Sequence, residues 1–238
     1  MVESEICLRE EGSVLLVHPD YEGQVTVDWF RPEFWGAKAQ PVSSGGRGGA
    51  WFIDTGAGRV VLREYRRGGL VARISEQNYV FSREQDVRSV AEFRLLNQLV
   101  NMGLPVPRPV AAWYRKVPTF QYRAAIIIER LDGTTPLAEL IPILDPSDWQ
   151  VIGRTVRRFH DAGVRHADLN CFNVLVRDGT CFLIDFDKGR IMPRQAPEKW
   201  KASNLERFAR SIRKVAGESA LARVWDSFLN GYNGSQNS

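Results

Sequence analysis

The sequence predicts an α+β fold of two lobes, a strand-rich lobe followed by a helix-rich lobe. The first half carries short apolar stretches divided by glycine-containing turns, with one amphipathic helical segment among them. The second half carries longer segments in which apolar residues recur every three or four positions, around one short hairpin. The pattern changes near residues 129–134. We therefore expect an N-lobe at 1–131 and a C-lobe at 132–238.

The first half contains three apolar stretches bounded by turn residues. They predict strands at 50–53, 60–62 and 124–128. A glycine-rich run, Ser43 to Gly49, precedes the first of these strands, and the turn at 55–58 joins the first two into a hairpin. Apolar residues at helical spacing predict a helix over 89–102, which Gly103 ends.

The second half is mostly helical. Pro146-Ser147-Asp148 opens a helix that Gly163 closes, and two further helical patterns cover 203–216 and 218–232. Between these helices, apolar residues on either side of Arg177-Asp178-Gly179 predict a small hairpin. Its strands are 174–176 and 182–184.

Composition favours an intracellular globular protein. The 238 residues are 44% hydrophobic and 25% charged, and the three cysteines form no CxxC pair. The acidic N-terminus lacks the order of a signal peptide, and no apolar run approaches the roughly 18–20 residues that span a bilayer. These features argue against a secreted or integral membrane protein. A net charge of +4 without an aromatic–basic repeat also argues against a nucleic-acid-binding module.

The most informative motif is His166-Ala167-Asp168-Leu169-Asn170-Cys171-Phe172-Asn173, followed by Asp185 at the end of an apolar strand. This spacing matches the kinase-type catalytic loop H-x-D-x-x-x-x-N and its D-F-x metal loop. Phosphoryl transfer from ATP needs an acid that receives the acceptor hydroxyl's proton, which we assign to Asp168. It also needs hard oxygen ligands for Mg²⁺, which we assign to Asn173 and Asp185. His166 is expected to brace the loop through its ring.

A nucleotide-binding region is expected in the first half. Backbone N–H groups of Gly45, Gly46, Arg47 and Gly48 are candidates for approaching phosphates closely. Arg63 ends the strand after the hairpin, at the place where a phosphate-binding Lys is usual in kinases, and Glu92 on the next helix is its expected partner. Lys38 and Glu84 are the weaker alternatives for this pair.

Beyond the catalytic motif, several stretches resemble the 3-deoxy-D-manno-octulosonic acid (Kdo) kinases of Gram-negative bacteria, relatives of the lipopolysaccharide core heptose kinases. The stretches that carry the resemblance are 61–69, 103–109, 166–170, 184–190 and 204–207. The resemblance implies a protein-kinase-like fold and transfer of the ATP γ-phosphate to the 4-hydroxyl of Kdo on lipid A precursor, in lipopolysaccharide core synthesis. It also implies a peripheral position on the cytoplasmic side of the inner membrane. By position, Asp168 would be the family's base, and Asn173 and Asp185 its magnesium ligands.

The residues leave other functions open. A related kinase could act on a core heptose, a small-molecule alcohol or a protein Ser/Thr, because motifs do not report the acceptor. A nucleotide-binding scaffold without catalysis is a further alternative. The one feature that favours it is Arg63, at the position where kinases usually have Lys. Basic residues offer contacts to an anionic lipid acceptor or to the anionic membrane surface: Arg66, Arg67 and the helix at 203–216. No obligate protein partner is expected.

Overall fold

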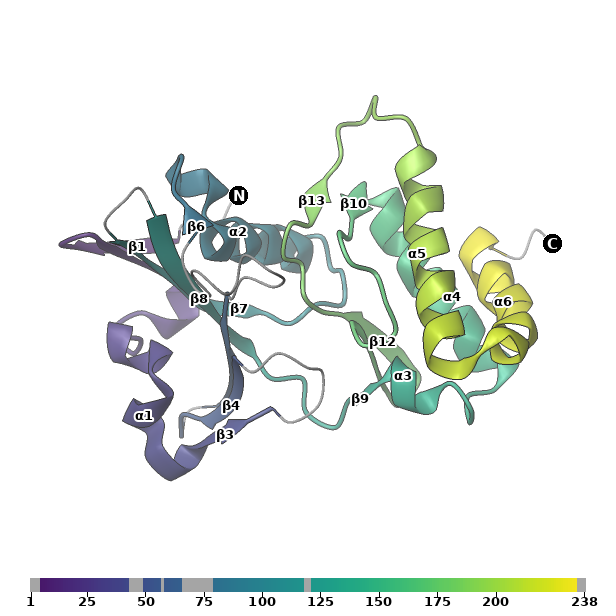
Figure 1. Cartoon of the computed structure of the whole chain (residues 1–238), viewed down its shortest axis with the longest axis horizontal. Helices are drawn as coiled ribbons and strands as arrows, with labels where there is room; N and C mark the ends of the chain where they lie inside the picture. The colour runs from purple at the N-terminus through teal and green to yellow at the C-terminus, as the bar shows by residue number, and fades with distance from the viewer. Residues whose placement is uncertain (1–4, 43–48, 57, 66–78, 118–120, 235–238) are drawn as a thin grey trace. The chain divides into compact units, whose positions relative to one another are not determined.

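The computed structural model describes residues 5–42, 49–56, 58–65, 79–117 and 121–234. The chain forms two compact units, Met1–Gln98 with Pro107–Arg130, and Leu99–Val106 with Leu131–Ser238 (Figure 1). The first unit is strand-rich and the second is helix-rich. Residues 99–106 group with the second unit, while the division of the chain into lobes at residue 131 stays a prediction.

An antiparallel sheet organises the first unit. Among the described residues, seven strands follow one another across it in the order β1 (Ile6–Glu10), β2 (Ser13–Val17), β7 (Pro109–Val117), β8 (Gln121–Glu129), β5 (Arg59–Glu64), β4 (Ala50–Asp54) and β3 (Ala39–Pro41). An eighth strand, β6 (Tyr79–Val80), pairs with β8 away from this path. Arg63 lies on β5, opposite Ala50 of β4 and Ile126 of β8, so the neighbouring strands fix its backbone on both sides.

Helical segments complete the first unit. The long one is α2 (Arg88–Asn101), whose last residues belong to the second unit. The short ones are η1 (Pro19–Tyr21), η2 (Val27–Phe30), α1 (Pro32–Trp35), η3 (Gly36–Lys38) and η5 (Glu84–Asp86). Trp29 and Phe30 of η2 are buried in a core cluster that also contains Leu15, Leu62 and Ile127 of the sheet. The sheet therefore has one face packed on the N-terminal helical segments.

The predicted hairpin and helix of the first unit are present, and the structure adds β7, a strand that was not predicted from the sequence. Prolines at 105, 107 and 109 follow α2 and are incompatible with its continuation, and Pro109 is the first residue of a nine-residue strand. Proline is tolerated at the first position of a strand because its missing N–H breaks no bond further along the ladder. Residues 110–112 are fully buried, which explains why this strand lacks the alternation of a half-exposed one.

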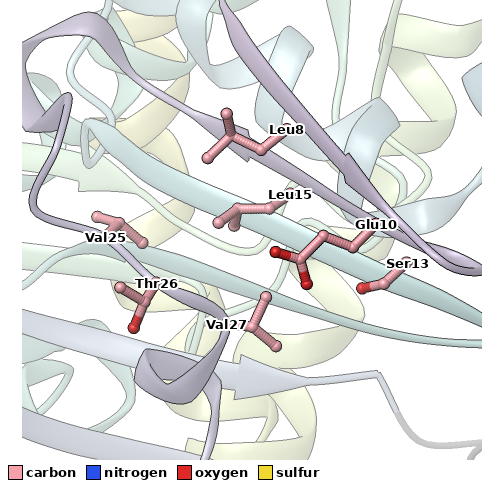
Figure 2. Close-up of a pocket in the computed structure, with 7 residues that line it drawn as sticks. All are labelled: Leu8, Glu10, Ser13, Leu15, Val25, Thr26 and Val27. Carbon is pink, nitrogen blue, oxygen red and sulfur yellow. The ribbon is translucent and has the colours of Figure 1, made fainter.

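The first unit also contains a cavity of about 150 Å³ beside the β1–β2 hairpin (Figure 2). Its lining residues are Leu8, Glu10, Ser13, Leu15, Val25, Thr26 and Val27. None of them is a residue to which the sequence assigns chemistry.

The second unit combines helices with two small sheets. Its helices are α3 (Leu137–Leu140), α4 (Pro146–Asp161), α5 (Lys199–Ala216) and α6 (Glu218–Asn233). One sheet has the order β12 (Thr180–Leu183), β11 (Val174–Arg177) and β9 (Thr135–Pro136), and the other pairs β10 (Val164–Arg165) with β13 (Arg190–Ile191). Figure 1 shows α4, α5 and α6 packed together. Among the described helices, none is both long and apolar enough to cross a bilayer.

Two local features fix α4, the helix that precedes the predicted catalytic loop. The Asp145 side chain accepts hydrogen bonds from the N–H groups of Ser147 and Asp148, and the Asp148 carboxylate accepts one from the Asp145 backbone N–H, which forms a capping box. Further along, Gly153 of α4 faces Gly231 of α6. A Cβ atom on Gly153 would lie 2.1 Å from the Phe228 carbonyl oxygen, so these helices approach each other through their backbones.

Candidate active site

The predicted catalytic loop connects β10 to β11 and is ordered by its own side chains. Asn170 Oδ1 accepts from the backbone N–H groups of Phe172 (2.8 Å) and Asn173 (3.2 Å), which makes an Asx turn. Asn170 Nδ2 donates to Oδ2 of Asp168 at 3.1 Å, and Asn173 Nδ2 donates to the Asp168 backbone oxygen at 2.9 Å. The loop therefore holds the carboxylate and the amide in fixed relation. The part played by Asn170 was not foreseen from the sequence.

His166 joins this loop to the strand that carries Asp185. Its Nε2–H donates to the Ile184 carbonyl at 2.9 Å, and its Nδ1 accepts from the Asp168 backbone N–H at 3.1 Å. This pairing requires the neutral ring with the proton on Nε2. Burial lowers the pKa of His166 and favours the same neutral form. The bracing expected of His166 is present, and it fixes the backbone on both sides of the site.

Asp185 follows β12 and sits in the left-handed region at φ 63°. Aspartate is one of the few non-glycine residues that adopt this conformation readily. The Ile184 N–H donates to the Asn173 carbonyl at 3.0 Å, so the backbone brings positions 173 and 185 together. Phe186 is fully buried against His166, with ring centroids 4.8 Å apart, and anchors the chain directly after Asp185. This packing fixes the backbone position from which the Asp185 side chain extends.

Asn173 and Asp185 have the chemistry of a magnesium site that is completed by a nucleotide. Because Asn173 Nδ2 is occupied by the Asp168 carbonyl, its Oδ1 is the amide atom left for a cation. The described residues contain no group of three or more His, Cys, Asp or Glu side chains that could hold a metal. Two protein oxygens suit Mg²⁺, which keeps waters and phosphate oxygens in its shell, better than a cation that needs a full protein cage.

Helix α5 contributes three contacts that sequence reasoning did not predict. Asn204 Nδ2 donates to the His166 carbonyl at 2.8 Å, and the Ser211 hydroxyl accepts from the Cys171 N–H at 2.9 Å. Between them, Arg207 Nη1 donates to Asp168 Oδ1 at 2.9 Å. The three side chains are spaced three and four positions apart on one face of the helix, and this spacing is the signal that was available in the sequence.

In the first unit, Arg63 and Glu92 form the ion pair expected from the sequence. Glu92 is 2% exposed and also accepts a hydrogen bond from the Tyr65 hydroxyl, while the Arg63 guanidinium lies 5.4 Å from the Tyr65 ring centroid. The alternative acid, Glu84, is paired with Arg9 at 2.7 Å, and this arginine lowers its pKa. The proposed phosphate loop of Gly45, Gly46, Arg47 and Gly48 lies outside the described residues, as do Arg66 and Arg67.

Comparison with known proteins identifies the family. The model of the lipopolysaccharide kinase (Kdo/WaaP) family matches residues 32–232. The chain belongs to this family. A relative named 3-deoxy-D-manno-octulosonic acid kinase, from Xylella fastidiosa strain M12, is 46% identical over 86% of this chain and 82% of its own length. A relative of the same name from Stenotrophomonas maltophilia strain R551-3 is 45% identical over 87% of this chain and 82% of its own length.

Solved structures place this kinase in the protein-kinase-like fold. A structure described as WaaP in complex with acyl carrier protein aligns with a TM-score of 0.59 and 18% identity, over 92% of this chain and 88% of its own. The Rio2 kinase complex with ADP/Mg²⁺ and phosphoaspartate from Chaetomium thermophilum aligns with a TM-score of 0.51 and 19% identity, over 82% of this chain and 66% of its own. The α+β, kinase-like fold predicted from the sequence is thereby confirmed.

Proposed function

We propose that this kinase transfers the γ-phosphate of ATP to the 4-hydroxyl of a Kdo residue on lipid A precursor, in lipopolysaccharide core synthesis. The curated relatives named Kdo kinase support the acceptor, since they are 44–46% identical over more than four fifths of the chain. One structural observation supports the reaction: the loop places the 56% exposed Asp168 carboxylate beside Asn173, and His166 ties that loop to the strand before Asp185.

Within this proposal Asp168 acts on the acceptor. Its carboxylate accepts the hydrogen bond of the sugar hydroxyl, orients that oxygen for attack and receives its proton. The backbone bonds to His166 and Asn173 keep the loop in place, so the carboxylate does not have to be ordered when the acceptor binds.

Asn173 and Asp185 hold magnesium through their side-chain oxygens. Magnesium, when bound, neutralises negative charge on the phosphates during transfer. The contribution of the protein is to keep an amide and a carboxylate oxygen at set positions, through the Ile184 N–H bond to the Asn173 carbonyl.

Arg63 binds phosphate oxygens of ATP, and Glu92 orients its guanidinium. Arginine can donate two parallel hydrogen bonds to a phosphate, so it can replace the strand lysine that is usual in kinases, although with less freedom to adjust. Backbone N–H groups of Gly45, Gly46, Arg47 and Gly48 complete the phosphate contacts in this proposal.

We further propose peripheral attachment to the cytoplasmic face of the inner membrane through the basic side chains of α5. Arg213 is engaged with Glu218 at the helix end, so Arg210 and Lys214 are the better candidates for contact with anionic lipid. The Arg210→Glu/Lys214→Glu variant should lose binding to vesicles that contain anionic lipid, with purely zwitterionic vesicles as the control. Unchanged sedimentation with anionic vesicles would refute the docking role.

Mass spectrometry of the acceptor tests the proposed activity. The purified kinase is incubated with ATP, Mg²⁺ and Kdo-lipid A precursor, and a parallel reaction contains a heptosylated acceptor whose Kdo is already phosphorylated. We expect one added phosphoryl group on the Kdo residue in the first reaction and none in the second. Phosphorylation of the heptosylated acceptor alone would instead support the related heptose kinase activity.

A further inference from the structure

Arg207 is the charged member of the three side chains with which α5 contacts the catalytic loop. Asn204 and Ser211 bind backbone groups of His166 and Cys171, which is sufficient to dock the helix against the loop. Arg207 instead binds a side chain, the carboxylate of Asp168. Its guanidinium is therefore directed at the group that, in the proposed function, contacts the acceptor hydroxyl.

The guanidinium of Arg207 retains hydrogen-bonding capacity for a ligand. Arginine has five N–H donors in a planar fork, and within the described part of the chain the recorded hydrogen bond of Arg207 uses Nη1 alone. The edge formed by Nε and Nη2 suits a second carboxylate, which it can bind through two parallel bonds. Because Arg207 is 47% exposed and Asp168 is 56% exposed, a ligand at the carboxylate can reach this edge.

The proposed acceptor presents such a carboxylate close to its reacting hydroxyl. Kdo is a 2-ulosonic acid in which only C3 and C2 separate the carbon that bears the 4-hydroxyl from the C1 carboxylate. A hydroxyl that hydrogen-bonds to Asp168 thus brings a second negative charge near the first, and like charges at such range disfavour binding. A cation that contacts both carboxylates removes this repulsion.

We propose that Arg207 is a specificity-determining residue that binds the carboxylate of the acceptor sugar while it holds Asp168. It thereby selects an anionic ulosonic acid over a neutral sugar. This inference rests on the proposed Kdo kinase function. It assigns Arg207 to the acceptor rather than to ATP, since the phosphates have Mg²⁺ and Arg63 as their proposed cations.

Steady-state kinetics with Kdo-lipid and its C1 methyl ester test the inference, because the two acceptors differ in charge at this carboxylate. The wild type, Arg207→Ala and Arg207→Lys are compared with Arg154→Ala, which removes an exposed arginine from α4. We expect the wild type to prefer the acid over the ester in kcat/KM by about 10- to 100-fold, the usual range for a hydrogen bond to a charged group. Arg154→Ala should keep this preference.

In Arg207→Ala the preference should disappear through a raised KM for the acid, with the KM for ATP unchanged. Arg207→Lys should recover part of it. The inference is overturned if the wild type uses both acceptors equally, or if Arg207→Ala loses the same factor on both, which would limit Arg207 to orienting Asp168. A raised KM for ATP in Arg207→Ala would overturn it in favour of a phosphate contact.

If the wild type phosphorylates neither acceptor, the proposed function itself fails. If the wild type phosphorylates both acceptors equally, the proposed function stands and only the inference about Arg207 fails.

Discussion

The two units position their functional side chains by different physical means. In the first, Arg63 and Glu92 come from β5 and α2, and a largely buried charge pair joins them. In the second unit, His166, Asn170 and Asn173 order the catalytic loop through neutral hydrogen bonds. The ordered loop holds the exposed carboxylate of Asp168 in place. Removing one member of a buried ion pair strands a charge, whereas a neutral network loses one bond at a time. Substitutions should therefore change stability and activity together in the first unit and separately in the second.

The largest expected effect is on turnover in the Asp168→Asn variant. The amide cannot receive the acceptor's proton, so kcat should fall about 1000-fold, within the range for loss of a general base. The asparagine oxygen can accept one of the two hydrogen bonds that Arg207 and Asn170 donate to Asp168, and the other is lost. Because both bonds are exposed, water can replace the lost one, so the melting temperature and the ATP dissociation constant should stay close to wild type. Near-normal turnover would exclude Asp168 as the base. A large drop in melting temperature would show that activity and stability are not separable here.

Removal of Glu92 should affect both properties at once. Glu92→Ala leaves the largely buried Arg63 charge without its carboxylate, and such losses cost about 3–5 kcal/mol of unfolding free energy. Glu92→Gln keeps an acceptor for Tyr65 and Arg63 and should cost less. Asp28→Ala breaks an exposed pair with Arg31 and serves as the control, with an expected cost below about 1 kcal/mol. Urea unfolding measures all three. Equal midpoints for Glu92→Ala and Asp28→Ala would contradict a special role for the buried pair.

The sequence predicted most of the loop because its geometry is local. Asp168 and Asn173 are five positions apart, and the residues between them decide how the chain turns. The Arg63–Glu92 pair is separated by 29 positions, but it too could be inferred. The sequence pattern predicted a strand that ends near Arg63 and a helix that contains Glu92, the two elements that carry this pair in kinases. Both predictions relied on elements whose periodicity was clear.

The contacts of α5 could not be predicted in the same way. Arg207 lies 39 positions after Asp168. The spacing of Asn204, Arg207 and Ser211 groups them on one face of α5, but it does not show that this face meets the loop. The same limit applies to Gly153 and Gly231, which look like helix-weakening residues until the crossing of α4 and α6 is known. Tertiary approach, rather than local preference, determines what these residues do.

Gly153→Ala tests how tightly the helical scaffold holds the second unit. Alanine favours a helix over glycine by about 1 kcal/mol, but its Cβ would lie 2.1 Å from the Phe228 carbonyl oxygen. The obstacle is backbone, which cannot rotate away, so we expect a net loss of about 3 kcal/mol in thermal or urea unfolding. Gly58→Ala has no neighbouring atom within 4 Å and should change stability by less than about 0.5 kcal/mol. A stabilised Gly153→Ala protein would show that α4 and α6 separate easily.

The smallest expected effect is a pH dependence from His160, which is buried in the second unit and hydrogen-bonded through Nδ1 to the Tyr232 hydroxyl at 2.7 Å. Burial lowers its pKa from 6.5 to about 4. Below pH 6.5 the unfolded chain binds a proton here that the folded chain does not, so the unfolding free energy falls as the pH drops toward 4, by at most about 3 kcal/mol. His160→Asn keeps a polar atom near the Nδ1 position but does not titrate. Its unfolding free energy, measured in urea at pH 7 and pH 5, should fall less than that of the wild type. Equal slopes in the two proteins would show that His160 does not contribute, and that the acid sensitivity of this unit arises from other groups such as His166.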